Sequence, residues 1–243
     1  MVRPTMNILT FTILAENYLG FSFYHEEYHM DKKTKFNFFT VNEDYMRPLQ
    51  KIDSEVRTST DDKNNRPFLG VVLNVENRLF FVPLSSPPKI PTDLPPELLK
   101  KKIKEVKRIE KNRLTVRVLS EAENNRHLCN VIVGKMIPVP ESQIKKISIE
   151  ELMDSSNPTE SKYGRLLYKE YLAINKIEDK IEQTAQAFYE ESINKPVKNK
   201  KIFYRVDLPQ AIKYHDRWIE RESIYKKDNL QDNKKDKSKG FSR

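Results

Sequence analysis

Two adjacent hydroxyl groups near a lysine are the first combination in this sequence that could act on a phosphate. Ser85 and Ser86 follow the apolar run 78–84, and Lys89 comes three residues later, after two prolines. A hydroxyl can donate and accept hydrogen bonds, and an ammonium group can neutralise phosphate charge. The Ser-Ser-Pro-Pro composition is also typical of a turn that ends a strand. From these residues alone, the turn is the simpler interpretation.

The other polar residues offer less for metal or acid-base chemistry. The lone cysteine, Cys129, excludes an internal disulfide and a Cys-rich zinc site, and it fits a cytoplasmic protein. His127 lies in a polar segment and His215 on an apolar helical stripe, so we take neither as an acid-base candidate. Asp61 and Asp62 lack a third ligand and are typical of a solvated loop. With no glycine-rich nucleotide motif among its 5 glycines, the sequence predicts no metal and no cofactor.

Basic charge is concentrated in one part of the chain. The 243 residues carry a formal net charge of +9, and residues 86–150 alone carry 14 basic and 8 acidic side chains. Residues 94–112 predict a helix with Leu99, Ile103 and Val106 on one face. Its other faces carry Lys100, Lys101, Lys104, Lys107, Arg108 and Lys111. Such a surface predicts contact with the phosphate backbone of a nucleic acid.

Hairpins and helices alternate irregularly along the chain, which predicts an α+β fold with a mainly antiparallel sheet and flanking helices. A strand over 35–41 precedes Asn42, which is a typical helix cap. Two apolar runs, 68–75 and 78–84, flank Glu76-Asn77 and predict a two-residue hairpin. Further predicted elements are strands over 114–119 and 129–139, a short helix after Ser148, a long helix over about 161–192 and a last helix from Leu208.

One domain with a segment on either side is expected for a chain of this length. We predict an N-terminal extension over 1–35, a single domain over 36–225 and a disordered basic tail over 226–243, which carries 7 basic and 3 acidic side chains. The apolar run 8–23 is interrupted by Glu and Asn and lacks a cleavage site, so it predicts neither a signal peptide nor a membrane span. Met30 is an alternative start of translation.

Several segments match a known family in order and spacing. They are Tyr45 in the first predicted helix, Arg66-Pro-Phe-Leu-Gly-Val-Val-Leu, Phe80-Phe-Val-Pro-Leu-Ser-Ser-Pro-Pro-Lys, Asn130-Val-Ile-Val-Gly-Lys-Met-Ile-Pro-Val and Tyr163-Gly-Arg-Leu-Leu-Tyr-Lys-Glu-Tyr-Leu-Ala-Ile-Asn. Together they resemble the ToxN/AbiQ family, the protein component of type III toxin-antitoxin systems. The resemblance runs from about residue 36 to residue 218.

This resemblance implies a metal-independent endoribonuclease toxin with a compact twisted sheet similar to that of the Kid and MazF toxins. It also implies an RNA antitoxin whose pseudoknot repeats close into a cyclic assembly with the protein. The expected setting is phage defence by abortive infection, or plasmid maintenance, in the cytoplasm.

The resemblance also implies a catalytic site. Ser85 and Ser86 match the family's hydroxyl pair, Arg66 matches its basic residue before the preceding strand, and Tyr45 matches its tyrosine from the first helix. For Tyr45, packing in the core is an equal alternative. Where the family commonly has a lysine directly after Ser-Pro, this chain has a proline, and Lys89 follows one position later.

Cleavage of RNA without a metal would use side chains for three tasks. The attacking 2′-OH must lose a proton, charge on the phosphate must be stabilised and the departing 5′ oxygen must gain a proton. The expected products are a 2′,3′-cyclic phosphate and a 5′-OH end, because the attacking oxygen belongs to the substrate. The alternative is a degenerate, non-catalytic RNA-binding protein that uses the same basic surface, and a membrane-surface protein is disfavoured because the basic helix has no interfacial Trp or Phe.

Overall fold

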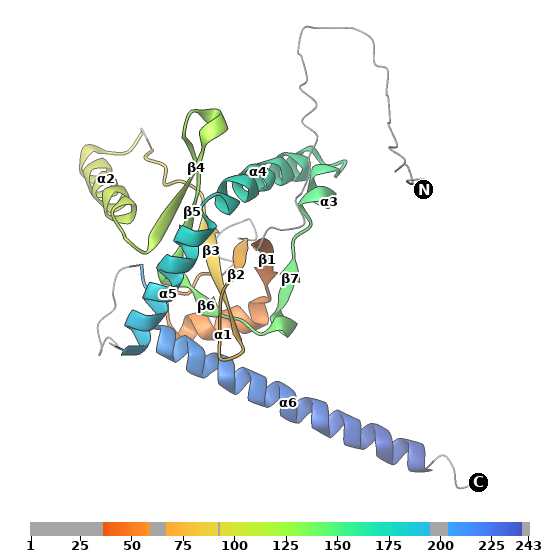
Figure 1. Cartoon of the computed structure of the whole chain (residues 1–243). Helices are drawn as coiled ribbons and strands as arrows, with labels where there is room; N and C mark the ends of the chain where they lie inside the picture. Colours follow the sequence, from red (N-terminus) through yellow and green to blue (C-terminus); the bar gives the residue numbers. More distant parts are fainter. Residues whose placement is uncertain (1–35, 59–66, 92, 195–203, 240–243) are drawn as a thin grey trace, which may run out of the picture. The chain divides into compact units, whose positions relative to one another are not determined.

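The computed structural model describes residues 36–58, 67–91, 93–194 and 204–239, with side chains as far as residue 226 (Figure 1). All of these residues belong to one compact unit that comprises residues 34–243. The predicted N-terminal extension, with Met30, and the candidate Arg66 lie outside the described residues.

A seven-stranded sheet forms the centre of the described part of this unit, and its paired strands are antiparallel. The strand order is β4-β5-β3-β2-β1-β7, and β6 pairs with β3 beside this path. The strands are β1 Asn37–Val41, β2 Phe68–Val75, β3 Arg78–Ser85, β4 Thr115–Ser120, β5 Arg126–Ile132, β6 Ile137–Pro138 and β7 Ile144–Lys146.

Six α-helices accompany the sheet in the described residues. They are α1 Glu43–Ile52, α2 Pro96–Glu110, α3 Ile149–Met153, α4 Pro158–Asn175, α5 Glu178–Asn194 and α6 Leu208–Lys239. The predicted α+β class with a mainly antiparallel sheet and flanking helices is therefore confirmed. The likeness to the Kid and MazF toxins stays a prediction.

Local residue chemistry explains where the first elements begin and turn. Asn42 caps α1, because its side-chain oxygen accepts a hydrogen bond from the backbone N–H of Asp44 at 3.0 Å. Glu76 and Asn77 connect β2 to β3 with φ angles of 51° and 61°. Both angles lie in the left-handed region that a two-residue hairpin turn needs at its centre. The predicted hairpin is confirmed.

The predicted strand 129–139 is divided in the structure. β5 ends at Ile132, a short 3₁₀ turn occupies Val133–Lys135, and β6 follows. Both pieces pair with β3, β5 near its end and β6 near its middle. At the turn, a Cβ atom on Gly134 would clash with the backbone oxygen of Tyr204. The close approach of that distant segment therefore requires glycine here, which an apolar run by itself does not reveal.

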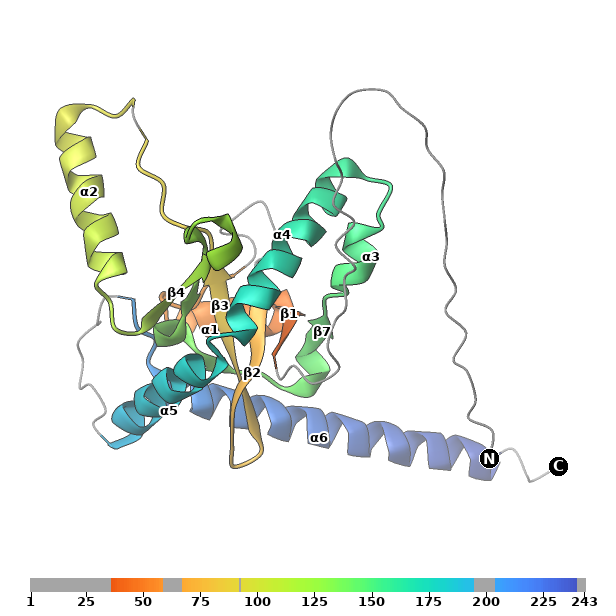
Figure 2. The same cartoon turned by 45° about the horizontal axis from the view of Figure 1, so that its top comes forward.

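The predicted helix 161–192 is also divided, because α4 ends at Asn175 and α5 begins at Glu178. α4 packs against β4 and β5, whereas α5 packs against β2 and α6 (Figure 2). One straight helix cannot cover both parts of the sheet, so the chain breaks between them. The apolar residues keep a helical period on both sides of the break, which is why the sequence predicts a single helix.

The last helix differs from the prediction at its C-terminal end. α6 continues to Lys239, through most of the segment 226–243 that the sequence predicts to be disordered. Between Leu208 and Lys239 the chain contains no glycine, and its one proline, Pro209, lies in the first turn, where proline is tolerated. A segment with few apolar residues can bury little surface against a core, but a helix does not end for that reason alone.

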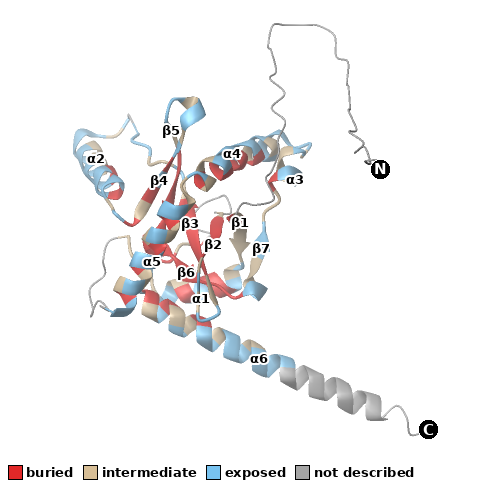
Figure 3. Ribbon diagram, in the orientation of Figure 1, coloured by how far each residue is buried: buried red, intermediate tan, exposed pale blue. Residues whose placement is uncertain are grey.

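Burial follows the layers of the fold. The buried residues gather on the central strands and on the helix faces that pack against them, whereas α2 is exposed over most of its surface (Figure 3). α3 and α4 pack closely, and Gly164 of α4 lies at their contact. A Cβ atom at Gly164 would lie 2.6 Å from the backbone nitrogen of Met153. The close packing of α3 against α4 thus depends on a residue without a side chain.

We expect Gly164→Ala to destabilise the protein. Alanine gains up to about 1 kcal/mol of helix propensity over glycine, but crowding against a backbone that cannot move aside costs about 1–3 kcal/mol. The free energy of unfolding in urea should therefore fall by about 1–2 kcal/mol. Lys162→Ala, on the exposed face of the same helix, is the control and should change it by less than about 0.5 kcal/mol. A more stable Gly164→Ala variant would show that α3 is free to shift.

Candidate functional site

A pocket of about 620 Å³ opens where β3 ends, and this volume lies within the range of small-molecule sites. Most of its lining comes from β3, β5, α2 and α4, which are distant in the sequence, and the rest comes from connecting segments. The polar and charged side chains in the lining are Arg57, Ser85, Ser86, Lys102, Glu105, Cys129, Asn130, Tyr163, Glu170 and Tyr204. The structure therefore brings the predicted hydroxyl pair together with polar groups from five other parts of the chain.

Strand pairing positions the two hydroxyl groups. Ser85 is the last residue of β3 and lies opposite Asn130 of β5 in the antiparallel register. One residue earlier, the backbone N–H of Leu84 donates to the carbonyl oxygen of Pro67 at 3.0 Å. Ser85 is half-buried, and Ser86, just beyond the last pair, is exposed. The strand end is held on both sides, and Ser86 is the first residue free to meet a ligand.

A buried amide beside the hydroxyl pair is also held in place. Asn130 is only 3% exposed, and its side-chain oxygen lies 2.9 Å from Nε2 of His127. The same nitrogen lies 3.1 Å from the carbonyl oxygen of Cys129. A carbonyl oxygen can only accept, so Nε2 of His127 carries the hydrogen and donates. His127 therefore orients Asn130 and is not among the residues that line the pocket.

Two groups on α4 that the sequence analysis did not select face this pocket. Tyr163 and Glu170 are seven residues apart, so they lie on the same face of the helix. Burial raises the pKa of Glu170 to about 7, and the Cys129 thiol opposes this rise as a hydrogen-bond donor. Burial, together with the nearby Glu170, raises the pKa of Tyr163 to about 12. The signal in the sequence is a polar pair at helical spacing, seven residues apart, inside the predicted long helix.

The two cations that line the pocket, Lys102 and Arg57, are not among the predicted site residues. Lys89 is exposed and does not line the pocket, although its neighbour Pro88 does. Lys102 lines the pocket and its Nζ lies 3.0 Å from Oε2 of Glu105. Arg57, from the segment after α1, also lines it. The six basic residues predicted to bind RNA are all exposed on α2 or directly after it, namely Lys100, Lys101, Lys104, Lys107, Arg108 and Lys111.

Tyr45 lies in the core and not in the pocket lining. It has no exposed surface, and its hydroxyl donates to the carbonyl oxygen of Pro138 at 2.7 Å. Its ring centroid is 5.2 Å from those of Tyr214 and Trp218 on α6. The structure therefore places Tyr45 where α1, β6 and α6 meet, which corresponds to the packing alternative that its position on an apolar stripe left open.

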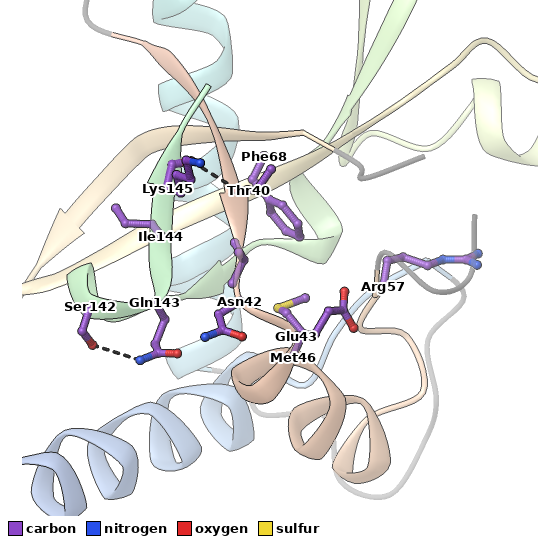
Figure 4. A pocket seen from close by; sticks show the side chains of 11 residues that line it. Thr40, Asn42, Glu43, Met46, Arg57, Phe68, Ser142, Gln143, Ile144 and Lys145 are labelled. Atoms are coloured by element: carbon purple, nitrogen blue, oxygen red, sulfur yellow. Dashed lines mark hydrogen bonds between the residues drawn. The ribbon is translucent and has the colours of Figure 1, made fainter. Parts of the chain in front are cut away.

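A second pocket, of about 320 Å³, lies at the ends of β1 and β7 (Figure 4). Its lining includes the amides of Asn42 and Gln143, the apolar side chains of Met46 and Phe68, and the guanidinium-bearing Arg57. Figure 4 shows Arg57 on the side of this pocket opposite Gln143. Arg57 also lines the first pocket, so one cation is common to both.

The described part of the chain contains no group of three or more His, Cys, Asp or Glu side chains arranged to hold a metal ion. None of its described helices is long and apolar enough to cross a bilayer.

Comparison with known protein families gave a match over residues 37–214. The matching family is described as toxin ToxN of type III toxin-antitoxin systems. The chain is 25% identical over 206 residues to the endoribonuclease ToxN of Bacillus thuringiensis subsp. kurstaki, which covers 82% of this chain and 92% of that protein. It is 27% identical over 152 residues to the endoribonuclease AbiQ of Lactococcus lactis subsp. lactis, covering 63% and 73% of the two chains.

A solved structure shares the fold. It belongs to a study of a type III toxin that is selectively inhibited by a non-coding RNA pseudoknot, and it superimposes with a TM-score of 0.57 at 23% identity. The alignment covers 76% of this chain and 98% of that one.

We expect Tyr45→Phe to weaken the fold. The change leaves the buried carbonyl oxygen of Pro138 without its 2.7 Å donor, which costs about 1–3 kcal/mol in the free energy of unfolding. Denaturant unfolding measures this loss. Tyr225→Phe is the control, because Tyr225 is 71% exposed and its hydroxyl is solvated. Equal stability of the two variants would contradict the core role assigned to Tyr45.

Proposed function

The chain belongs to the ToxN family of type III toxin-antitoxin toxins, and we propose that it is an endoribonuclease that cleaves RNA without a metal ion. The observation that carries this proposal is the pocket at the end of β3, where Ser85 and Ser86 meet ionisable groups from α2 and α4. The related proteins from Bacillus thuringiensis and Lactococcus lactis are named endoribonucleases. Both findings support the same activity for this chain.

In the proposed reaction the scissile phosphate lies against the end of β3. Ser86 and Ser85 hydrogen-bond its oxygens, and Lys102 and Arg57 supply positive charge as the fifth oxygen approaches phosphorus. The 2′ oxygen attacks and the 5′ oxygen leaves, which gives a 2′,3′-cyclic phosphate and a 5′-OH end. No covalent enzyme intermediate forms, because the nucleophile belongs to the substrate.

We also propose roles for the two cations that the resemblance implies. Lys89 is exposed one residue after the pocket-lining Pro88. A lysine side chain spans about 6 Å and one extended residue only about 3.3 Å, so its ammonium group can reach a phosphate bound at the serines. Arg66 directly precedes Pro67, another lining residue. Both would strengthen the positive field around the phosphate.

The flanking RNA would follow basic surface on both sides of the cleavage site. On one side lie the exposed lysines and Arg108 of α2. On the other, Arg57 connects the first pocket with the second, where amides and Phe68 could receive a base. The same surface suits a cognate RNA antitoxin with pseudoknot repeats that closes into a cyclic protein–RNA assembly. The inhibition of a structurally similar toxin by an RNA pseudoknot supports this partner.

The proposed biological role is phage defence by abortive infection in the cytoplasm.

One observation favours a second function, that of a degenerate RNA-binding protein. Pro88 stands where the family commonly has a lysine, and Lys89 does not line the pocket. If that displacement abolishes cleavage, the basic surface still binds RNA.

We predict that the purified protein cleaves single-stranded RNA in the presence of EDTA and that Ser86→Ala abolishes this cleavage. One preorganised donor to the phosphate is worth about a hundredfold or more in rate. Ser156→Ala, an exposed serine away from the pocket, is the matched control. Gel analysis of labelled RNA, with circular dichroism to check folding, measures the effect. Loss of cleavage in EDTA, or full activity of Ser86→Ala, would refute this mechanism.

We predict that reversing Lys100, Lys101, Lys104 and Lys107 to glutamate weakens RNA binding and flattens its dependence on salt. Each lost phosphate contact should lower the slope of log affinity against log salt by about 0.7 for a single strand. Fluorescence anisotropy over a range of salt concentrations gives this slope. The control reverses four exposed cations on α5 and α6, namely Lys180, Lys213, Arg217 and Arg221. Equal slopes for both variants would assign α2 to another task.

A further inference from the structure

The Glu170 carboxyl is a buried acidic group in the lining of the proposed catalytic pocket. Glu170 is 6% exposed on α4, and it lines the same pocket as Ser85 and Ser86. Its position therefore combines shielding from bulk water with access to a bound ligand. Glutamate is seldom this deeply buried without a charged partner, so the carboxyl calls for a functional explanation.

The surroundings of Glu170 leave its charge largely uncompensated. Burial is the main cause that raises its pKa to about 7, and the Cys129 thiol of β5 lowers it. The other charged or titratable groups that face the pocket are Tyr163 of α4, Lys102 and Glu105 of α2, Arg57 after α1 and Tyr204 before α6. On β4, which also packs against α4, Arg117 is exposed. Lys102 is paired with Glu105, so its charge is partly offset.

We propose that the Glu170 carboxylate is the base that removes the proton from the attacking 2′-OH of the RNA. This inference rests on the proposed function and assigns its missing proton acceptor. The 2′ oxygen forms a bond to phosphorus while its proton passes to Glu170. The bond between phosphorus and the 5′ oxygen breaks, the electron pair stays with that oxygen, and it takes up a proton from water. Glu170 then returns its proton to solvent.

The other nearby groups are less suited to this task. His127 donates from Nε2 to Asn130 and to a backbone carbonyl, and it does not line the pocket. Burial raises the pKa of the Cys129 thiol and of Tyr163, so both stay protonated and cannot accept a proton at neutral pH. Glu170 titrates near neutrality, where a base combines a useful deprotonated fraction with proton affinity.

The experiment is the pH dependence of kcat/KM for cleavage of a single-stranded RNA between about pH 5 and pH 8.5. For the wild-type protein we expect a rise of about tenfold per pH unit that levels off near pH 7. Glu170→Gln should lose this rise and at least about a hundredfold in rate at the plateau. Glu160→Gln makes the same change on the exposed part of α4 and should keep the wild-type profile.

A second variant changes the pKa of Glu170 without removing its carboxyl group. Cys129→Ala deletes the donor that stabilises the carboxylate, so the rise in rate should move to higher pH.

Thermal unfolding tests the ionisation of Glu170 through stability and needs no activity measurement. Because burial raises the folded-state pKa of Glu170, the wild-type protein should lose stability relative to Glu170→Gln as pH rises from about 4.5 through about 7. Below that window the difference in stability between the two proteins should not change with pH, since the Glu170 carboxyl is then neutral in both the folded and the unfolded state.

The outcomes separate the two proposals. A wild-type protein that cleaves RNA, together with a Glu170→Gln variant that keeps the rise and the rate, overturns the base assignment alone. An unmoved rise in Cys129→Ala also overturns it. A wild-type protein that cleaves no RNA at any pH overturns the proposed function itself, whatever the unfolding curves show.

Discussion

β3 pairs with three other strands, all antiparallel, and this pairing holds the centre of the sheet together. β2 pairs along one edge of β3, while β6 pairs with its middle and β5 with its end. β5 and β6 come from one stretch of chain with a turn at Val133–Lys135. β2 pairs with β3 as far as Pro83, and β5 pairs with it as far as Ser85. The hydroxyl pair therefore lies at the exit of a fixed strand, which suits a group that must meet a phosphate with defined geometry.

Lys135 and Glu170 are both buried ionisable residues, but their surroundings compensate their charges to different extents. Lys135 is 2% exposed, and its Nζ lies 3.1 Å from Oε2 of Glu55 and 4.4 Å from the centre of the Tyr204 ring. Its charge is thus compensated, and it connects the turn after β5 to two distant segments. Burial dominates the pKa of Glu170 instead, and its carboxyl faces a pocket. A compensated buried charge serves structure, whereas an uncompensated one at a pocket is suited to proton transfer.

α6 holds the other end of β3, where the strand begins. Arg78, the first residue of β3, donates to both carboxylate oxygens of Asp216 at 2.8 and 2.9 Å. Tyr214 and Trp218 on the same helix pack against the Tyr45 ring. Tyr214 also donates to the carbonyl oxygen of Tyr45 at 3.1 Å. The start of β3 is therefore anchored to α6 while its end is left open to a ligand, which separates the stabilising contacts from the site.

Most local elements, and the hydroxyl pair at the end of a strand, can be predicted from the sequence. The Asn42 cap and the Glu76-Asn77 turn were predictable because their signals lie within a few neighbouring residues. Only the tertiary structure decided that the apolar run after Cys129 turns at Gly134, and that one helical stripe divides into α4 and α5. It also decided that Tyr45 packs in the core while Glu170 faces the pocket. Those outcomes depend on contacts between residues distant in sequence, and a helical or alternating pattern is the same whichever partner covers it.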